Sequence, residues 1–154
     1  MPTLTHPDIG VNIELEHDIS SLTNLRTVRI YGDEDNIDLN SSMSVIRRYL
    51  LQFGKHALHL EEISIELYYE DKASLEAFST LDSVLAGDGF NKLKLVKLEV
   101  QLPMEVECNA SLKTISKIFK DVRETFPLVQ KRAAVKAIMP LSLYPWRATG
   151  GRVV

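Results

Sequence analysis

The feature that most constrains the fold is a short apolar pattern that returns at nearly equal intervals. The pattern L-x-x-[V/I]-x-[I/L] occurs as LRTVRI, LEEISI and LKLVKL at residues 25–30, 60–65 and 93–98. The leading leucines are 35 residues apart (25 to 60) and then 33 residues apart (60 to 93). A period in the thirties is typical of proteins built from repeated supersecondary units. We therefore expect a repeat architecture.

Two other segments continue the pattern more loosely. Residues 128–138 hold a weaker copy after the third one, and Val11, Ile13 and Leu15 form a candidate earlier copy. In the three clear copies and in the candidate earlier copy apolar residues alternate with polar ones, and this alternation favours half-buried β-strands.

Segments with helical spacing separate the predicted strands. Apolar residues recur every three or four positions at residues 43–53, 75–85 and 112–126, as expected for amphipathic helices. Capping and helix-breaking residues predict the boundaries: Ser41 or Ser42 and Gly54 for the first helix, Gly87 to Gly89 for the end of the second, and Ser111 and Pro127 for the third.

The order of strands and helices predicts an α/β fold with parallel strands joined by helical crossovers. Parallel strands covered on both faces read as continuous apolar runs. Here every second strand residue is polar, for example Glu62, Ser64 and Glu66, so we expect helices on one face only and an open solenoid arc. We assign residues 1–143 to this single domain. Residues 144–154 lack periodicity and are predicted to form a disordered tail.

Length and composition narrow the class of protein. A chain of 154 residues that is 45% hydrophobic fits one domain with a continuous core. The single cysteine, Cys108, excludes an internal disulfide framework and suits a reducing compartment. No signal peptide is evident, and no apolar run approaches the ~20 residues that cross a bilayer. We expect a cytoplasmic or nuclear protein that does not enter a membrane.

The charge is distributed unevenly along the chain. Residues 1–90 hold 16 acidic and 6 basic side chains, whereas residues 91–154 hold 5 acidic and 12 basic ones. Basic residues recur at Lys113, Lys117, Lys120, Arg123, Lys131, Arg132 and Lys136. One interpretation is a nucleic-acid-binding surface in the C-terminal third. We favour an ordinary solvated helix face, because the whole chain is acidic and helices carry charge opposite their apolar stripe.

Residues that carry chemistry do not form a recognisable motif. The histidines, His6, His17, His56 and His59, lack the spacing of metal ligands. The acidic run at residues 33–38 starts like a calcium loop, but it lacks the glycine and the final glutamate that such loops require. We expect no enzyme activity, no catalytic residue, no cofactor and no metal site.

The repeated strands and their linking segments resemble a known family. The pieces SLTNLRTVRIYGD, LHLEEISIEL, SLEAFSTLDSVLAGDGFNKLKLVKLEV and FPLVQKRAAVKAI are similar to the C-terminal leucine-rich-repeat-like region of fungal F-box/LRR-type proteins. The similarity includes an L-D-x-x-L helix core at residues 81–85 and a Phe-x-x-Leu strand entry at residues 90–93. The resemblance implies a leucine-rich-repeat-like open solenoid over roughly residues 20–138.

The chain also departs from that family. The F-box itself, which binds a ubiquitin-ligase adaptor, has no counterpart here. Phe78 stands where the family often has Trp. Asp33, Tyr68 and Gln101 occupy the position at which short leucine-rich repeats have Asn. The resemblance therefore implies a substrate-recognition half without its ligase-docking half.

We expect a non-catalytic protein–protein interaction module that binds a protein partner through the exposed polar positions of its strands. Their charge is expected to change from acidic-rich to basic-rich along the arc, and this change would orient the partner. A truncated relative without independent function is an alternative. The partner and the oligomeric state stay open. The predicted partner-binding residues are Arg29, Tyr31, Glu62, Ser64, Glu66, Lys97, Glu99 and Lys136.

Overall fold

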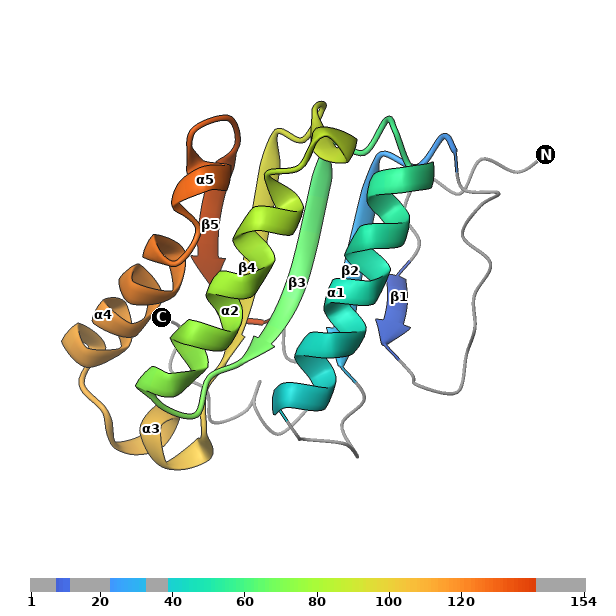
Figure 1. Ribbon diagram of the computed structural model, residues 1–154. Helices are drawn as coiled ribbons and strands as arrows, with labels where there is room; N and C mark the ends of the chain where they lie inside the picture. Colours follow the sequence, from blue (N-terminus) through green and yellow to red (C-terminus); the bar gives the residue numbers. More distant parts are fainter. Residues whose placement is uncertain (1–7, 12–22, 33–38, 141–154) are drawn as a thin grey trace.

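A computed structural model describes residues 8–11, 23–32 and 39–140, and these form a parallel five-stranded sheet. The strands lie side by side in chain order, and each pairs in parallel with the next (Figure 1). Their bounds are β1 (Asp8–Val11), β2 (Thr27–Gly32), β3 (Glu62–Tyr68), β4 (Leu95–Gln101) and β5 (Ala134–Ile138). The predicted α/β class with parallel strands is confirmed.

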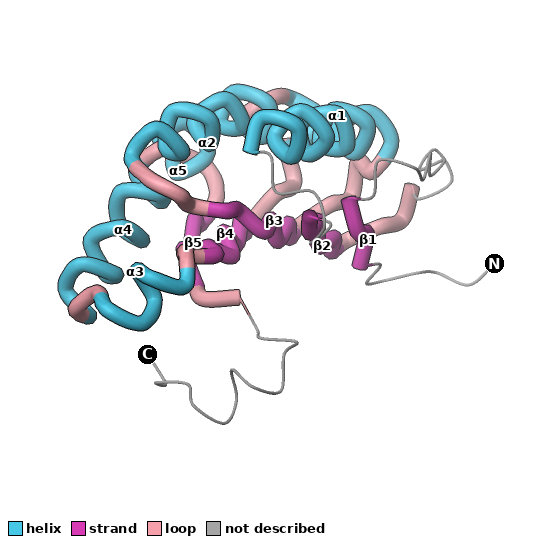
Figure 2. The backbone as a smooth tube through the Cα atoms, turned by 90° about the horizontal axis from the view of Figure 1, so that it is seen from below, coloured by secondary structure: helices cyan, strands magenta, loops and turns pink. Residues whose placement is uncertain are grey.

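Helices connect the strands and lie along one face of the sheet (Figure 2). Helix α1 links β2 to β3, α2 and η1 link β3 to β4, and the remaining helices link β4 to β5. Their bounds are α1 (Leu39–His56), α2 (Lys72–Leu85), η1 (Asp88–Phe90), α3 (Met104–Asn109), α4 (Leu112–Glu124) and α5 (Pro127–Gln130).

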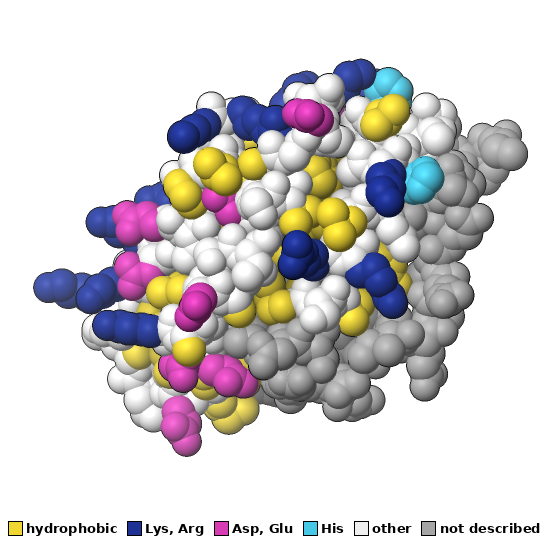
Figure 3. Space-filling model, in the orientation of Figure 1, with side chains coloured by type: hydrophobic (Ala, Val, Ile, Leu, Met, Phe, Trp, Pro, Cys, Tyr) yellow, Lys and Arg dark blue, Asp and Glu magenta, His cyan; other side chains and the backbone are white. Residues whose placement is uncertain are grey.

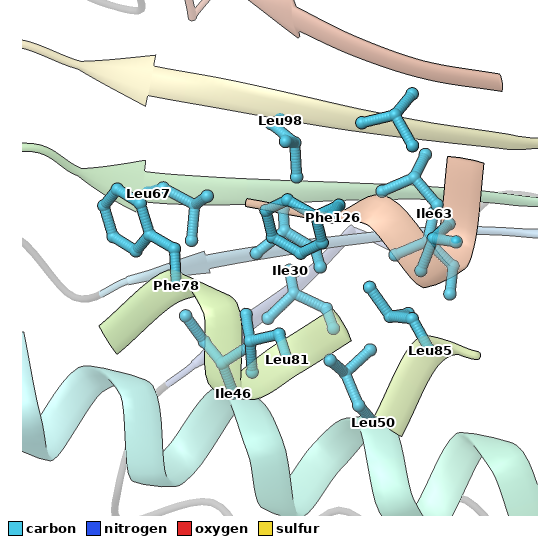
Figure 4. Close-up of a cluster of buried hydrophobic side chains, with 14 of the residues drawn as sticks. Ile30, Ile46, Leu50, Ile63, Leu67, Phe78, Leu81, Leu85, Leu98 and Phe126 are labelled. Carbon is cyan, nitrogen blue, oxygen red and sulfur yellow. The ribbon is translucent and has the colours of Figure 1, made fainter. Parts of the chain in front are cut away.

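The core lies between the sheet and the helices. The register aligns the alternating apolar residues of neighbouring strands into rows, one of which contains Ile30, Ile65 and Leu98. All three side chains are buried, and those of Ile30 and Leu98 point towards side chains from α1 and α2 (Figure 4). Burying an aliphatic or aromatic side chain of this size contributes about 1.5–3 kcal/mol, so this layer supplies most of the driving force for folding.

The structure places some helix boundaries differently from the sequence prediction. Helix α1 begins at Leu39 and continues through Gly54 to His56, so the predicted stop at Gly54 is wrong. A Cβ atom at Gly54 would lie 3.1 Å from the Phe90 ring, and one at Gly89 would lie 2.2 Å from the Gly54 carbonyl oxygen. Glycine is needed here for close packing of η1 on α1, and it does not end the helix.

The first turns of α2 and α4 are capped by side chains. The Asp71 carboxylate accepts a hydrogen bond of 2.8 Å from the Ala73 amide, and Ser74 reaches back to the Asp71 amide in a capping box. Ser111 caps α4 by accepting from the Thr114 amide, so the predicted start of that helix is confirmed.

Asp82 ties α2 to α5 across the helix layer. Its carboxylate is only 5% exposed and accepts hydrogen bonds from the amides of Leu128 (3.0 Å) and Val129 (2.9 Å). Those amides belong to the first turn of α5, where no helical carbonyl is available to them. Arg132 strengthens the same junction by donating to the carbonyl oxygens of Leu85 and Gly87 at the end of α2.

Parts of two predictions fall beyond the described residues. Strand β1 includes Val11, but Ile13 and Leu15 of the predicted early strand lie outside the described residues. The predicted tail at residues 144–154 lies outside them as well.

Candidate interaction surface

The alternation in each strand gives the sheet a second face, opposite the helices, that carries mostly polar side chains. We call it the polar sheet face. Its strand positions are Arg29 on β2, Glu62, Ser64 and Glu66 on β3, Lys97, Glu99 and Gln101 on β4, and Lys136 on β5. The register aligns Arg29, Ser64, Lys97 and Lys136 in one row across neighbouring strands. Adjacent members of such a row are about 4.8 Å apart, so their side chains can interact.

Strands β3 and β4 are joined on this face by charged and polar pairs. The Lys97 ammonium nitrogen lies 2.5 Å from a carboxylate oxygen of Glu62. The side-chain amide of Gln101 donates a hydrogen bond to the Glu66 carboxylate. Both carboxylates therefore have partners on the next strand. Glu62, Glu66 and Lys97 are all half-buried.

Arg29 and Glu99 form an ion pair that passes over the strand between them. The Arg29 Nε atom donates to Glu99 Oε2 at 2.8 Å, although β3 separates their strands. Ser64 lies beside Arg29 in the register of β3. Its small side chain leaves room for the guanidinium group to extend towards β4.

This ion pair explains two corrections to the predicted surface. Ser64 is 8% exposed and Glu99 is 4% exposed, so the prediction that they are exposed binding positions is wrong. The Ser64 side chain is shorter than those of its neighbours on this face. The ion pair with Arg29 holds the Glu99 side chain against the sheet. Both residues position Arg29, which is itself half-buried.

The charge on the polar sheet face follows the predicted change only in part. From β3 to β5 it changes from acidic (Glu62 and Glu66) through mixed (Lys97 and Glu99) to basic (Lys136), but the described series begins with the basic Arg29 on β2. Arg29 on β2 faces an acidic β3, and β4 carries both Lys97 and Glu99. Neighbouring strands thereby neutralise one another, which lowers the repulsion between the crowded side chains.

The remaining two predicted residues lie at different places on the sheet. Lys136 is exposed on β5, next to Lys97 in the register. Tyr31 belongs to β2, and its backbone pairs with that of Gly10 on β1. The side chain of Tyr31 lies outside the described part of the molecule.

The basic residues of the C-terminal third do not form one surface. Lys113, Lys117, Lys120 and Arg123 are exposed on α4, on the side away from its buried apolar residues. Arg132 is engaged with the carbonyl oxygens at the end of α2. Lys136 lies on the opposite face of the sheet, in the row of Lys97. A nucleic-acid surface made of all seven basic residues is not assembled in this fold.

The His, Cys, Asp and Glu side chains in the described ranges do not gather into a metal site. Among residues 8–11, 23–32 and 39–140, no cluster of three or more His, Cys, Asp or Glu side chains could hold a metal ion. His56 and His59 are exposed, and the His59 ring nitrogen lies 3.0 Å from the Lys92 ammonium. Cys108 lies within α3 and is exposed. No described helix is both long and apolar enough to cross a bilayer.

Fold and surface together define a parallel α/β protein whose helices cover one sheet face and whose other face is polar. No family model, curated protein or solved structure matches the chain.

Proposed function

We propose that the chain is a non-catalytic protein–protein interaction module that binds its partner through the polar sheet face. We further propose that the sheet and its helices form a leucine-rich-repeat-like open solenoid, similar to the substrate-recognition part of an F-box/LRR protein. The sequential strand order, the helices on one face and the 35- and 33-residue spacing of the leading leucines support this proposal. Cys108, the single cysteine, suits the reducing cytoplasm or nucleus.

The observation that carries the proposal is the set of ordered charges on the polar sheet face. A partly exposed surface pair such as Lys97–Glu62, whose side chains are 35% and 29% exposed, contributes only about 0.2–1 kcal/mol to stability, so folding does not require this arrangement. Ordered charges do favour recognition, because side chains held in place lose less conformational entropy when a partner binds. They also steer the encounter and reject partners of the wrong charge.

The side chains of the polar sheet face divide into two groups by accessibility. Glu62, Glu66, Lys97 and Lys136 remain accessible to a partner. The buried Glu99 fixes the direction of Arg29 beneath them. We therefore assign contact to the first group and positioning to Glu99.

The test is to replace Glu62, Glu66 and Lys97 together by alanine and to measure capture of protein partners from cells. We expect capture to be lost, whereas the circular dichroism spectrum should stay unchanged. The fold should tolerate the change because Glu62 and Lys97 are removed as a pair and leave no unpaired charge.

The matched control removes two acids and one base from the helix side. Glu76, Glu105 and Lys113 are exposed on α2, α3 and α4, and their replacement by alanine should leave capture intact. Capture that survives the triple change on the polar sheet face would refute the assignment of this surface.

A further inference from the structure

Exposed basic side chains line the edge of the sheet at which the strands begin. We call this set the basic edge: Arg26, Lys55, Lys92, Lys94 and Lys131. They come from the segments that lead into β2, β3, β4 and β5. Lys and Arg side chains are visible along this edge at the top of Figure 3.

Backbone hydrogen bonds make this edge continuous. The Glu62 amide donates to the Arg26 carbonyl, the Lys94 amide donates to the Glu61 carbonyl, and the Ala134 amide donates to the Lys94 carbonyl. The segments before β2, β3, β4 and β5 therefore follow the spacing of the sheet. These four segments are separated by three strand spacings of about 4.8 Å each, so the basic edge is about 14 Å long.

Two acidic residues, Glu61 and Asp88, lie in the segments that carry the five cations of the basic edge. Glu61 lies 3.3 Å from the Lys94 ammonium, but that lysine side chain remains 72% exposed. Within the described residues, no acidic side chain lies within ion-pair distance of Arg26, Lys92 or Lys131.

Helix ends explain only part of this charge. Lys55 lies in the last turn of α1 and Lys131 follows the last turn of α5, where cations offset the partial negative charge of the helix end. Arg26 and Lys94 directly precede strands and have no such role. At the opposite edge of the sheet, the segments that follow β3 and β4 carry four acidic residues, Glu70, Asp71, Glu105 and Glu107, and one basic residue, Lys72. Charge is therefore separated between the two ends of the strands.

We propose that the basic edge is a second interaction surface, independent of the polar sheet face, and that it binds an acidic extended segment of a protein partner. In an extended chain, side chains on one side recur about every 6.6–6.8 Å, so a few alternating carboxylates span the edge. Leu58 lies in the same segment as the entry to β3 and is 55% exposed, which offers an apolar contact beside the cations.

The side chains of this edge favour a peptide over a nucleic acid. Single-stranded nucleic acids bind proteins through aromatic platforms on which the bases stack. The described residues of the basic edge and its loops include no Tyr or Trp, and Phe90 is buried at the junction with α1. The exposed rings here are the small imidazoles of His56 and His59, and the His59 ring is paired with Lys92.

The test uses the full chain and a fluorescein-labelled peptide of alternating Glu and Leu, followed by fluorescence anisotropy at low salt. The triple change Arg26→Glu, Lys92→Glu and Lys131→Glu should weaken binding about tenfold or more, because three favourable charge contacts become repulsive. The control is Lys113→Glu, Lys117→Glu and Lys120→Glu on α4, which changes the net charge equally and should weaken binding about twofold or less. Circular dichroism spectra that match that of the unmodified chain would establish that both variants fold.

Three results would overturn the proposal. Equal weakening in the two variants would assign binding to the net charge of the chain. Tighter binding of a labelled oligothymidylate of equal net charge would assign the edge to nucleic acid. Self-association of the chain that disappears only in the edge variant would assign the edge to a second copy.

Discussion

The two faces of the sheet are made by the same strands, yet they are stabilised in different ways. Ile65 faces the helices and is completely buried, whereas its neighbour Glu66 faces away and hydrogen-bonds to Gln101 on β4. Burial of an apolar side chain requires a complementary shape around it but no specific partner atom. A charged pair, in contrast, requires both groups to lie at the right positions. The apolar face therefore holds the fold together, and the polar face presents charged groups whose positions are set by their pairs.

The largest expected effect separates the faces within a single strand. Ile65→Ala should lower the free energy of unfolding by about 2–5 kcal/mol, because it leaves a cavity between β3 and the helices. Glu66→Ala should cost about 1 kcal/mol or less, since water can replace a half-exposed hydrogen bond. Urea titration followed by circular dichroism measures both values. Equal losses for the two variants would contradict the division between the faces.

A smaller effect is expected at Glu99, the strongly buried carboxylate among the described residues of the polar sheet face. Arg29→Met should lower the free energy of unfolding by about 1–3 kcal/mol, because it leaves Glu99 buried without its cation. The double variant Arg29→Met with Glu99→Leu should recover part of that loss, since no charge is then left unpaired. Additive losses in the urea titrations of this cycle would show that the two groups do not stabilise each other.

The smallest effect at neutral pH concerns Tyr69, which follows β3 and is buried. Burial, with smaller contributions from the nearby charges of Asp121 and Asp71, raises the pKa of the Tyr69 hydroxyl above its usual value of 10.0. The folded state thus holds this proton more tightly than the unfolded state does. The stability from Tyr69 is complete below pH 10 and is lost as the pH rises towards the folded-state pKa.

Tyr69→Phe should therefore make stability less sensitive to pH above about 10. Tyr68→Phe, at the neighbouring position within β3, is the control. Urea midpoints at pH 7 and above pH 10 give the comparison. The same alkaline loss in the Tyr69→Phe variant as in the unmodified chain would contradict the role assigned to burial.

The sequence predicts the apolar face well because its cause is local. Alternation within a strand and three- to four-residue spacing within a helix both depend on near neighbours. The strand at residues 60–67 and the start of α4 at Ser111 were predicted from such patterns. Helix α3 has only six residues, too few to establish a period, and it was missed.

The polar face and the helix junctions depend on distant residues. Glu99 is buried because Arg29, 70 positions earlier, lies across β3 from it. Asp82 appears in sequence as part of an L-D-x-x-L motif, but its hydrogen-bond donors lie 46 and 47 positions later. Gly54 was interpreted as a helix stop because its contact with Phe90 cannot be inferred locally. The fold class could therefore be predicted from the sequence, whereas the solvent exposure of single surface residues could not.

We propose that a partner docks on the polar sheet face and not on the helices. Site-specific photo-crosslinking distinguishes the two surfaces, with p-benzoylphenylalanine placed at Lys136 on β5 or at Ser79 on α2, both exposed. Mass spectrometry should find the same partner protein crosslinked from position 136, lost with the Glu62, Glu66 and Lys97 triple variant, and no crosslink from position 79. A partner crosslinked from position 79 and not from position 136 would refute docking on the polar sheet face.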